Sequence, residues 1–123
     1  MNKMEKHITK RLVRSEHLNH HGSLFAGFGA QWFVESGYIA AASILDPNHL
    51  VCKQISTLNF MSSVRLGDII CFESWVSKLG TTSITTHTMV TKNNNPNKLL
   101  VEGDSVFVYV DENTKPIPHN LNN

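Results

Sequence analysis

The sequence lacks a long hydrophobic run, a strong charge of either sign and a basic stripe. Its 123 residues include 11 Lys and Arg against 10 Asp and Glu, so the formal net charge is only +1. Nucleic-acid-binding proteins usually concentrate basic residues on one face, so nucleic acid is not the expected partner. No apolar run reaches the roughly 18 to 20 residues that a membrane span needs, and we expect none.

Cysteine is also scarce, which bears on the compartment. Cys52 and Cys71 lack the spacing of metal ligands, and we interpret them as free, buried thiols in a reducing environment. The N-terminal residues alternate charged with single apolar side chains and have no signal-peptide core. These features predict a cytoplasmic protein.

What is present indicates a single globular domain over residues 1–123. Hydrophobic residues make up 41% and charged residues 17%, which is enough apolar material to build a core. No Gly/Ser/Pro-rich stretch divides the chain. The polar tail from about residue 112 is predicted to be mobile.

The residue pattern predicts one strand, one helix and then four strands, an α+β order. Residues 24–45 are apolar on nearly every face and should form a helix surrounded by protein, ended by Pro47. Asn93 to Asn97 are predicted to form a hairpin loop. The strands are expected at residues 7–14, 51–61, 68–77, 82–91 and 99–110. About five antiparallel strands can curl around one helix, and pairing of two copies edge to edge would protect an exposed sheet edge.

Three stretches in order carry a family resemblance. Residues 19–27 read NHHGSLFAG and are followed by WFVESG at 32–37; residues 60–68 read FMSSVRLGD; residues 80–83 read GTTS, with FVYVDE at 107–112 and Lys115-Pro116. Together they resemble the acyl-CoA thioesterase branch of the hotdog superfamily over residues 7–118.

This resemblance implies a hotdog fold, in which a curved antiparallel sheet wraps one long central helix. It also implies hydrolysis of acyl-CoA to a free acid and CoA, with no metal and no cofactor apart from the CoA of the substrate. The active site would lie between two subunits of a homodimer, or of a tetramer or hexamer. Asn19 from one chain and a helix carboxylate from the other would act together, and backbone N–H groups at the helix start would polarise the thioester carbonyl.

The chain departs from the family pattern at the catalytic carboxylate. Val34 occupies that helix position, and the next residue, Glu35, is about 100° further around the helix. Glu35 is one candidate base, and His20 or His21 is another because imidazole titrates near neutral pH. Gln31 shares the helical stripe of Val34 and is a candidate to hold a water. Glu35 paired with an Arg or Lys is the alternative that involves no chemistry.

The remaining site predictions concern substrate binding. The turn supplies Gly22, Phe25 and Gly27, with Gly27 allowing the thioester close to the backbone. By the resemblance, a second set lies near the pantetheine arm: Thr81, Thr82 and Ser83. Tunnel depth is predicted to depend on four large side chains: Phe28, Trp32, Tyr38 and Met61. His17, His20 and His21 lack a further ligand at suitable spacing, so no metal site is predicted.

Three functions stay open from the sequence. The first is acyl-CoA hydrolysis, and the second is a hotdog protein that binds acyl-CoA but has lost catalysis, which Val34 favours. The third is a hotdog dehydratase or hydratase, which would need a His paired with an acid that the helix does not supply.

Overall fold

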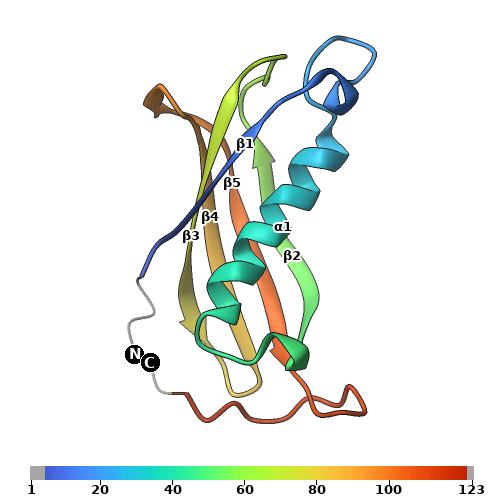
Figure 1. Cartoon of the computed structure of the whole chain (residues 1–123). Coiled ribbons are helices and arrows are strands. Elements are labelled where there is room, and N and C mark those ends of the chain that lie inside the picture. Colours follow the sequence, from blue (N-terminus) through green and yellow to red (C-terminus); the bar gives the residue numbers. More distant parts are fainter. Residues whose placement is uncertain (1–4, 122–123) are drawn as a thin grey trace.

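The structure, a computed structural model that describes residues 5–121, has one long helix lying against a five-stranded antiparallel sheet (Figure 1). The sheet order is β1-β3-β4-β5-β2, so β1 and β2 are its two edges. The elements are β1 (His7–Leu12), η1 (Ser15–His17), α1 (Ala26–Ala42), η2 (Pro47–His49), β2 (Leu50–Phe60), β3 (Ile69–Leu79), β4 (Ser83–Lys92) and β5 (Asn95–Tyr109). The predicted hotdog arrangement is confirmed.

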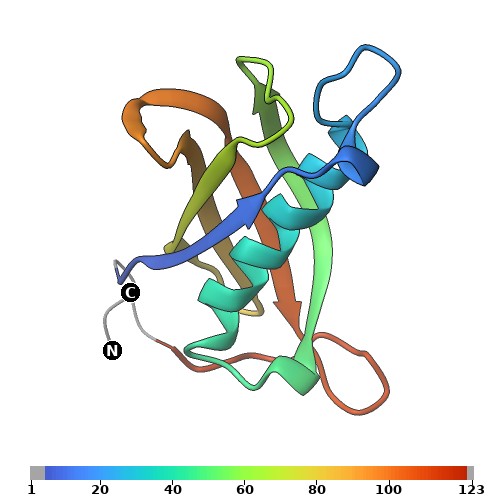
Figure 2. The same ribbon diagram turned by 45° about the horizontal axis from the view of Figure 1, so that its top comes forward.

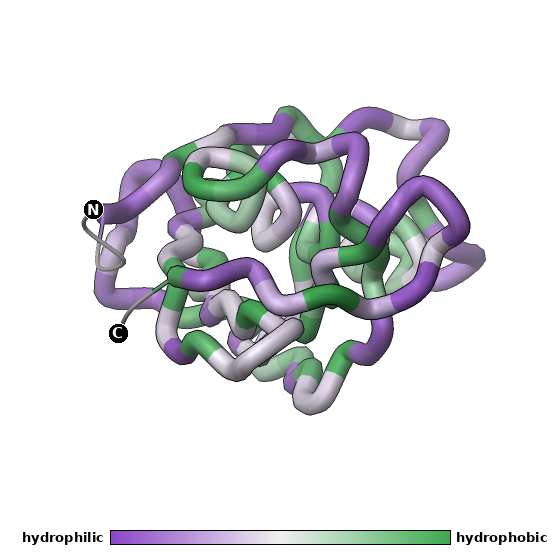
Figure 3. The backbone as a smooth tube through the Cα atoms, turned by 90° about the horizontal axis from the view of Figure 1, so that it is seen from below, coloured by the Kyte–Doolittle hydropathy of each residue, from purple (hydrophilic) through white to green (hydrophobic). Residues whose placement is uncertain are grey.

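One face of α1 forms the core with the sheet. Phe33 is 0% exposed, and Trp32 and Ala41 are buried with it. Removing a ring such as that of Phe33 from a packed core typically costs about 3–5 kcal/mol. Figure 2 shows α1 between the two edge strands, and in Figure 3 hydrophilic segments lie along much of the outer trace.

The opposite face of α1 is open in a single chain, contrary to the expectation of a helix surrounded on all sides. Gln31, Glu35 and Ile39 repeat every four residues along this face, and all three are exposed. The sheet therefore covers one side of the helix and leaves the other exposed in a single chain.

Small residues bring α1 close to the sheet. Ser36 Oγ lies 2.6 Å from Ser74 Oγ, which lies 2.6 Å from Thr88 Oγ1. A Cβ at Gly37 would stand 2.5 Å from Thr86 Oγ1, so a glycine is needed at this contact. The close approach fixes the rotation of the helix on the sheet.

The helix is shorter at both ends than the predicted residues 24–45. It starts after Phe25, whose backbone is extended, and the Ser43 hydroxyl donates to Ala40 O at 2.6 Å at the other end. Such a local side-chain bond competes with further helical bonding. Pro47 then opens η2, with Asp46 accepting the Asn48 N–H at 3.0 Å.

The predicted hairpin loop at residues 93–97 is wrong in length. The turn between β4 and β5 is only Asn93 and Asn94, because β5 already begins at Asn95. Two-residue hairpins favour asparagine. Pro96 is tolerated beside a register shift between Thr91 and Lys92, where a backbone N–H is not needed for the ladder.

Two further expectations concern the tail and the cysteines. The tail, predicted to be mobile, contacts the domain near its far end: the His119 N–H donates to Thr81 O at 3.2 Å and Leu121 contacts the core. Cys52 is exposed on β2 and Cys71 is half-buried, so neither is a buried thiol, although both are free. Within residues 5–121, no helix is long and apolar enough to cross a bilayer.

Candidate active site

The predicted site residues are spread along the length of the sheet: the Asn19 turn lies at one end, Thr81 to Ser83 lie at the other, and Gln31 and Glu35 lie between them on α1. The turn that holds Asn19 leads into the start of α1 (Figure 1), whereas Thr81 and Thr82 precede β4, near the end at which α1 finishes. A backbone hydrogen bond ties Thr82 to the end of β5, because the Tyr109 N–H donates to Thr82 O at 2.8 Å. A single chain does not bring these groups together.

Asn19 organises the turn. Its Oδ1 accepts the backbone N–H groups of His21 at 2.8 Å and Ser23 at 3.2 Å, and its Nδ2 donates to Ser23 Oγ at 3.2 Å. Gly22 closes the turn with φ +81°, a conformation that favours glycine. These bonds fix the shape of the loop that enters the helix.

The two histidines of the turn lie outside on the loop. His20 and His21 are exposed, with ring centroids 3.9 Å apart. The third histidine, His17, is instead structural: its Nδ1 accepts the Arg14 N–H at 3.0 Å and its ring packs 4.8 Å from Trp32. In the part of the chain that the structure describes, no group of three His, Cys, Asp or Glu side chains is arranged to hold a metal ion.

The helix start is partly covered by an aromatic ring. A Cβ on Gly27 would lie 2.5 Å from the Phe25 ring, so this ring already fills the space beside Gly27. Phe25 is itself more than half exposed. A ligand can reach the backbone at Gly27 if this ring turns away.

A pocket of about 330 Å³ opens beside the helix start. Ser23, Ser62 and Ser63 supply hydroxyls, and Ala26 supplies the first turn of α1. The other lining residues are Leu24, Phe60, Met61, Val64 and Val101. Unpaired N–H groups at a helix start favour negative charge, so this pocket is suited to a polarised carbonyl oxygen.

Glu35 is held by two side chains on the open face of α1. Arg11 Nη2 lies 2.7 Å from its Oε1, and Gln31 Nε2 donates to its Oε2 at 3.4 Å. The Arg11 guanidinium also stacks 5.3 Å from the Trp32 ring. The ion pair that the sequence left as an alternative for Glu35 is therefore present.

Glu35 also borders an apolar pocket of about 440 Å³ between α1 and β2. Val34, Tyr38 and Ile39 line it from the helix, and Cys52 and Phe107 line it from the sheet. The pocket thus has one carboxylate at its margin and mostly apolar side chains elsewhere, a composition that fits an apolar chain with one polar end.

The predicted tunnel residues are only partly placed in these pockets. Tyr38 lines the apolar pocket and Met61 lines the pocket at the helix start. Trp32 is wrong as a tunnel residue, because it is buried against Phe72 in the core, and Phe28 packs against the same cluster. Both belong to the sheet-facing side of α1.

Sequence reasoning missed Arg11, Cys52 and Phe107 as neighbours of the site. Arg11 lies two residues before the buried Val13, so strand alternation could have placed it on the inner face. Cys52 and Phe107 are cross-strand partners in β2 and β5, and only the strand order brings them together.

The tail contacts the backbone of Thr81 and Ser83, although the Thr81 side chain is exposed. His119 Nε2 lies 2.9 Å from Ser83 O, and the His119 N–H donates to Thr81 O. Their backbone carbonyls are thus occupied.

Comparison with known proteins gives the family context. A profile described as the thioesterase superfamily matches residues 21–97, more than half of the chain. A solved apo hexameric acyl-CoA thioesterase is 31% identical with a TM-score of 0.81, and the match covers 92% of this chain and 74% of that one.

Two other solved structures show the same fold at lower identity. An acyl-CoA hydrolase from Staphylococcus aureus, in complex with butyryl coenzyme A, coenzyme A and coenzyme A disulfide, is 24% identical with a TM-score of 0.81, covering 92% of this chain and 68% of that one. A hexameric thioesterase from Yersinia pestis is 22% identical with a TM-score of 0.84, covering 99% and 100%. No curated protein matches the sequence.

Proposed function

The chain belongs to the thioesterase superfamily, and we propose that it hydrolyses acyl-CoA thioesters to a free acid and CoA at a site shared by two copies of the chain. The observation that carries this proposal is the apolar pocket with Glu35 at its margin. In this proposal the acyl group enters that pocket, and the reaction needs no metal and no cofactor other than the CoA of the substrate. The cytoplasm is the proposed compartment, on the ground of the free thiols of Cys52 and Cys71.

The proposed partner is a second copy that pairs through β2. In an antiparallel self-pairing of this edge, the partner's helix start lies toward the end of this chain where Thr81 is found. Apolar side chains support such a contact, since Val51, Ile55 and Phe60 are 40–48% exposed along β2. The pairing would bring Asn19 of one chain toward Glu35 of the other, and dimers could assemble further into tetramers or hexamers.

Glu35 is the proposed base. It takes a proton from a water positioned by Gln31, and the water oxygen bonds to the thioester carbon. The oxyanion forms at the helix start of the other chain, where backbone N–H groups face it, with Asn19 keeping the turn in shape. The carbon–sulfur bond then breaks, and the CoA sulfur takes up a proton.

Arg11 and Gln31 orient the proposed base. One Glu35 oxygen contacts the guanidinium and the other the Gln31 amide, so the carboxylate cannot rotate freely. The competing bases, His20 and His21, are exposed on the turn that also holds Asn19, so they remain the alternative to Glu35.

A matched pair of variants tests the proposal. Glu35→Gln should lower kcat for acyl-CoA hydrolysis, followed by thiol release, at least about 100-fold, the usual effect of losing a general base. Glu16→Gln, which removes another exposed carboxylate that pairs with an arginine, should leave the rate unchanged. A fully active Glu35→Gln variant, together with a His20→Gln/His21→Gln double variant of lost activity, would transfer the role to the histidines.

The second candidate is an acyl-CoA-binding protein without catalysis. The ion pair of Glu35 with Arg11 favours it, as does Val34 at the position of the family carboxylate. Micromolar binding of acyl-CoA without any thiol release over hours would establish this function and contradict the first.

A further inference from the structure

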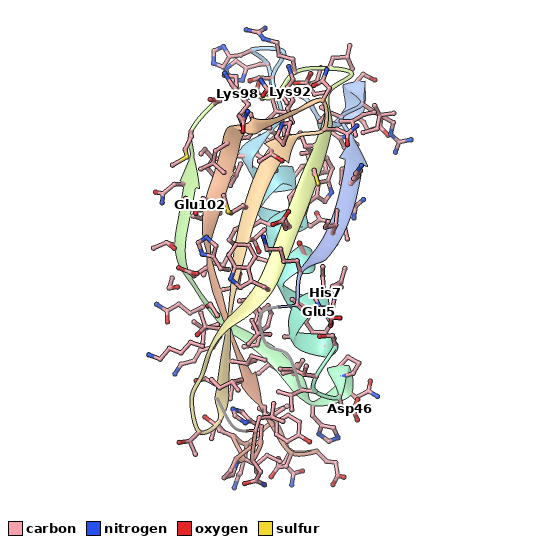
Figure 4. The ribbon with its side chains drawn as sticks, turned by 90° about the vertical axis from the view of Figure 1, so that its left-hand side faces the viewer. Glu5, His7, Asp46, Lys92, Lys98 and Glu102 are labelled. Carbon is pink, nitrogen blue, oxygen red and sulfur yellow. The ribbon has the colours of Figure 1, made fainter. Side chains whose placement is uncertain are left out.

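On the face of the sheet away from α1, a histidine lies between two carboxylates. His87 on β4 has Nδ1 2.8 Å from Asp104 Oδ1 and Nε2 2.8 Å from Glu102 Oε2, both on β5. Its neighbours Thr86 and Thr88 are buried under the helix, so strand alternation puts His87 on the outer face. Figure 4 looks onto this outer face, with Glu102 labelled.

These two contacts indicate which protonation state of the His87 ring suits the cluster. A neutral imidazole has one N–H, so it can satisfy only one carboxylate; two contacts at 2.8 Å require both nitrogens to donate. The cluster is therefore complete only when His87 carries a positive charge. The ring nitrogens point in opposite directions, so these three side chains cannot surround a single metal ion.

The other groups around His87 do not supply a replacement proton. On β3, the Trp75 ring lies 5.0 Å from the His87 ring, and Glu73 on the same face pairs with Lys6 at 2.9 Å. Lys6 also stacks 5.3 Å from Trp75. Lys6, the cation over Trp75, is thus already paired with another acid.

Asp104 connects the His87 cluster to the edge strand β2. Its Oδ2 accepts the Thr57 hydroxyl of β2 at 3.2 Å. At the same place β5 and β2 are unusually close, because a Cβ on Gly103 would overlap the Thr57 carbonyl oxygen. The β2 register shifts between Ile55 and Thr57, so the ladder is irregular where this side-chain bond attaches.

We propose that protonation of His87 strengthens the attachment of β2: the charged ring holds Asp104, which accepts the Thr57 hydroxyl, and deprotonation weakens this side-chain link while the backbone ladder between β2 and β5 remains. Without the proton, one of the two carboxylates loses its donor and the two negative charges on β5 repel each other. This goes beyond the proposed hydrolysis but bears on it, since β2 is the proposed pairing edge and Cys52 on β2 borders the apolar pocket.

The direction of the pH effect follows from the pKa of His87. Burial opposes protonation, but hydrogen bonds and charge attraction from Asp104 and Glu102 together raise this pKa above its usual 6.5. A raised pKa gives a stabilisation that is complete below pH 6.5 and is lost as the pH rises through the folded-state value. We expect β2 to loosen as the pH rises through this raised pKa.

Amide hydrogen exchange of β2 in the full chain tests the proposal. The protection factor is the exchange rate of an unstructured chain divided by the observed rate at the same pH. For the β2 amides it should fall about threefold to tenfold between about pH 6 and about pH 9. His87→Gln, which keeps one amide donor, should show no such fall. The matched control is His7→Gln, because His7 is 23% exposed like His87 and also faces an acid, and it should behave as the wild type.

The Thr57→Val variant removes the hydrogen bond between β2 and Asp104 but keeps His87 and both carboxylates. It should leave the titration of the His87 ring, followed by NMR, unchanged while removing the pH response of β2. Equal protection of wild-type β2 at both pH values, or a pH response that survives in Thr57→Val, would overturn the proposal. A chain that is monomeric or lacks hydrolase activity contradicts the proposed function, whereas the difference in pH response between the wild type and Thr57→Val tests this link in either oligomeric state.

Discussion

At the scale of single residues, the interface between α1 and the sheet is unusual in its hydroxyl content. Five serine and threonine side chains there are almost completely buried: Ser36, Ser74, Thr86, Thr88 and Ser105. Three form the bonded row that begins at Ser36. Thr86 Oγ1 and Ser105 Oγ have no hydrogen-bond partner within residues 5–121. A buried hydroxyl without a partner lowers stability.

Replacing Thr86 by valine should therefore stabilise the protein. The change keeps the shape and removes the unsatisfied hydroxyl, and we expect the free energy of unfolding to rise by about 1 kcal/mol in a urea titration. Thr88→Val is the opposite control, since its hydroxyl bonds Ser74, and it should lower stability by a similar amount. Destabilisation by both variants would show that Thr86 has a polar partner after all.

At the scale of elements, strand positions could be predicted well because β-branched alternation marks them. The expected strand at 82–91 is observed as Ser83–Lys92 and the one at 51–61 as Leu50–Phe60. The ends of α1 were predicted less well, because its apolar residues continue beyond Ala42. A serine hydroxyl, rather than a change in hydrophobicity, accompanies the end of the helix.

The candidate site was less accessible to sequence reasoning. The turn motif located Asn19 and the helix located Glu35, but the sequence left the partner of Glu35 open. Arg11 is 24 residues away, and only the crossing of β1 over α1 brings it within 2.7 Å. The His87 cluster depends similarly on the β4–β5 register, which pairs His87 with Asp104.

The two edge strands offer a test of the proposed pairing. Ile55→Lys places a charge on β2 at a side chain that is 40% exposed, so it should convert the dimer to monomer while leaving the fold intact, as measured by light scattering after gel filtration. Ile8→Lys on β1, where the side chain is 58% exposed, should leave the dimer unchanged. Loss of the dimer in Ile8→Lys alone would instead place the contact at β1.

At the scale of the whole molecule, the two ends of the sheet hold different parts of the proposed site. The helix start and Asn19 lie at one end, Thr81 to Ser83 lie at the other, and Glu35 lies between them on a face that the sheet leaves open. One chain alone has no contact between Asn19 and Glu35. In the proposed function, a reversed second copy supplies what each copy lacks, and the site is made by two chains.

Subunit mixing measures this claim most directly. Asn19→Ala and Glu35→Gln variants should each hydrolyse acyl-CoA poorly by themselves. Dissociated together in equal amounts and reassociated, they should recover about a quarter of the wild-type rate, because half of random dimers are mixed and one of the two sites in each is intact. If the mixture is no more active than the separate variants, although mixed dimers have formed, the site belongs to a single chain and the account is contradicted.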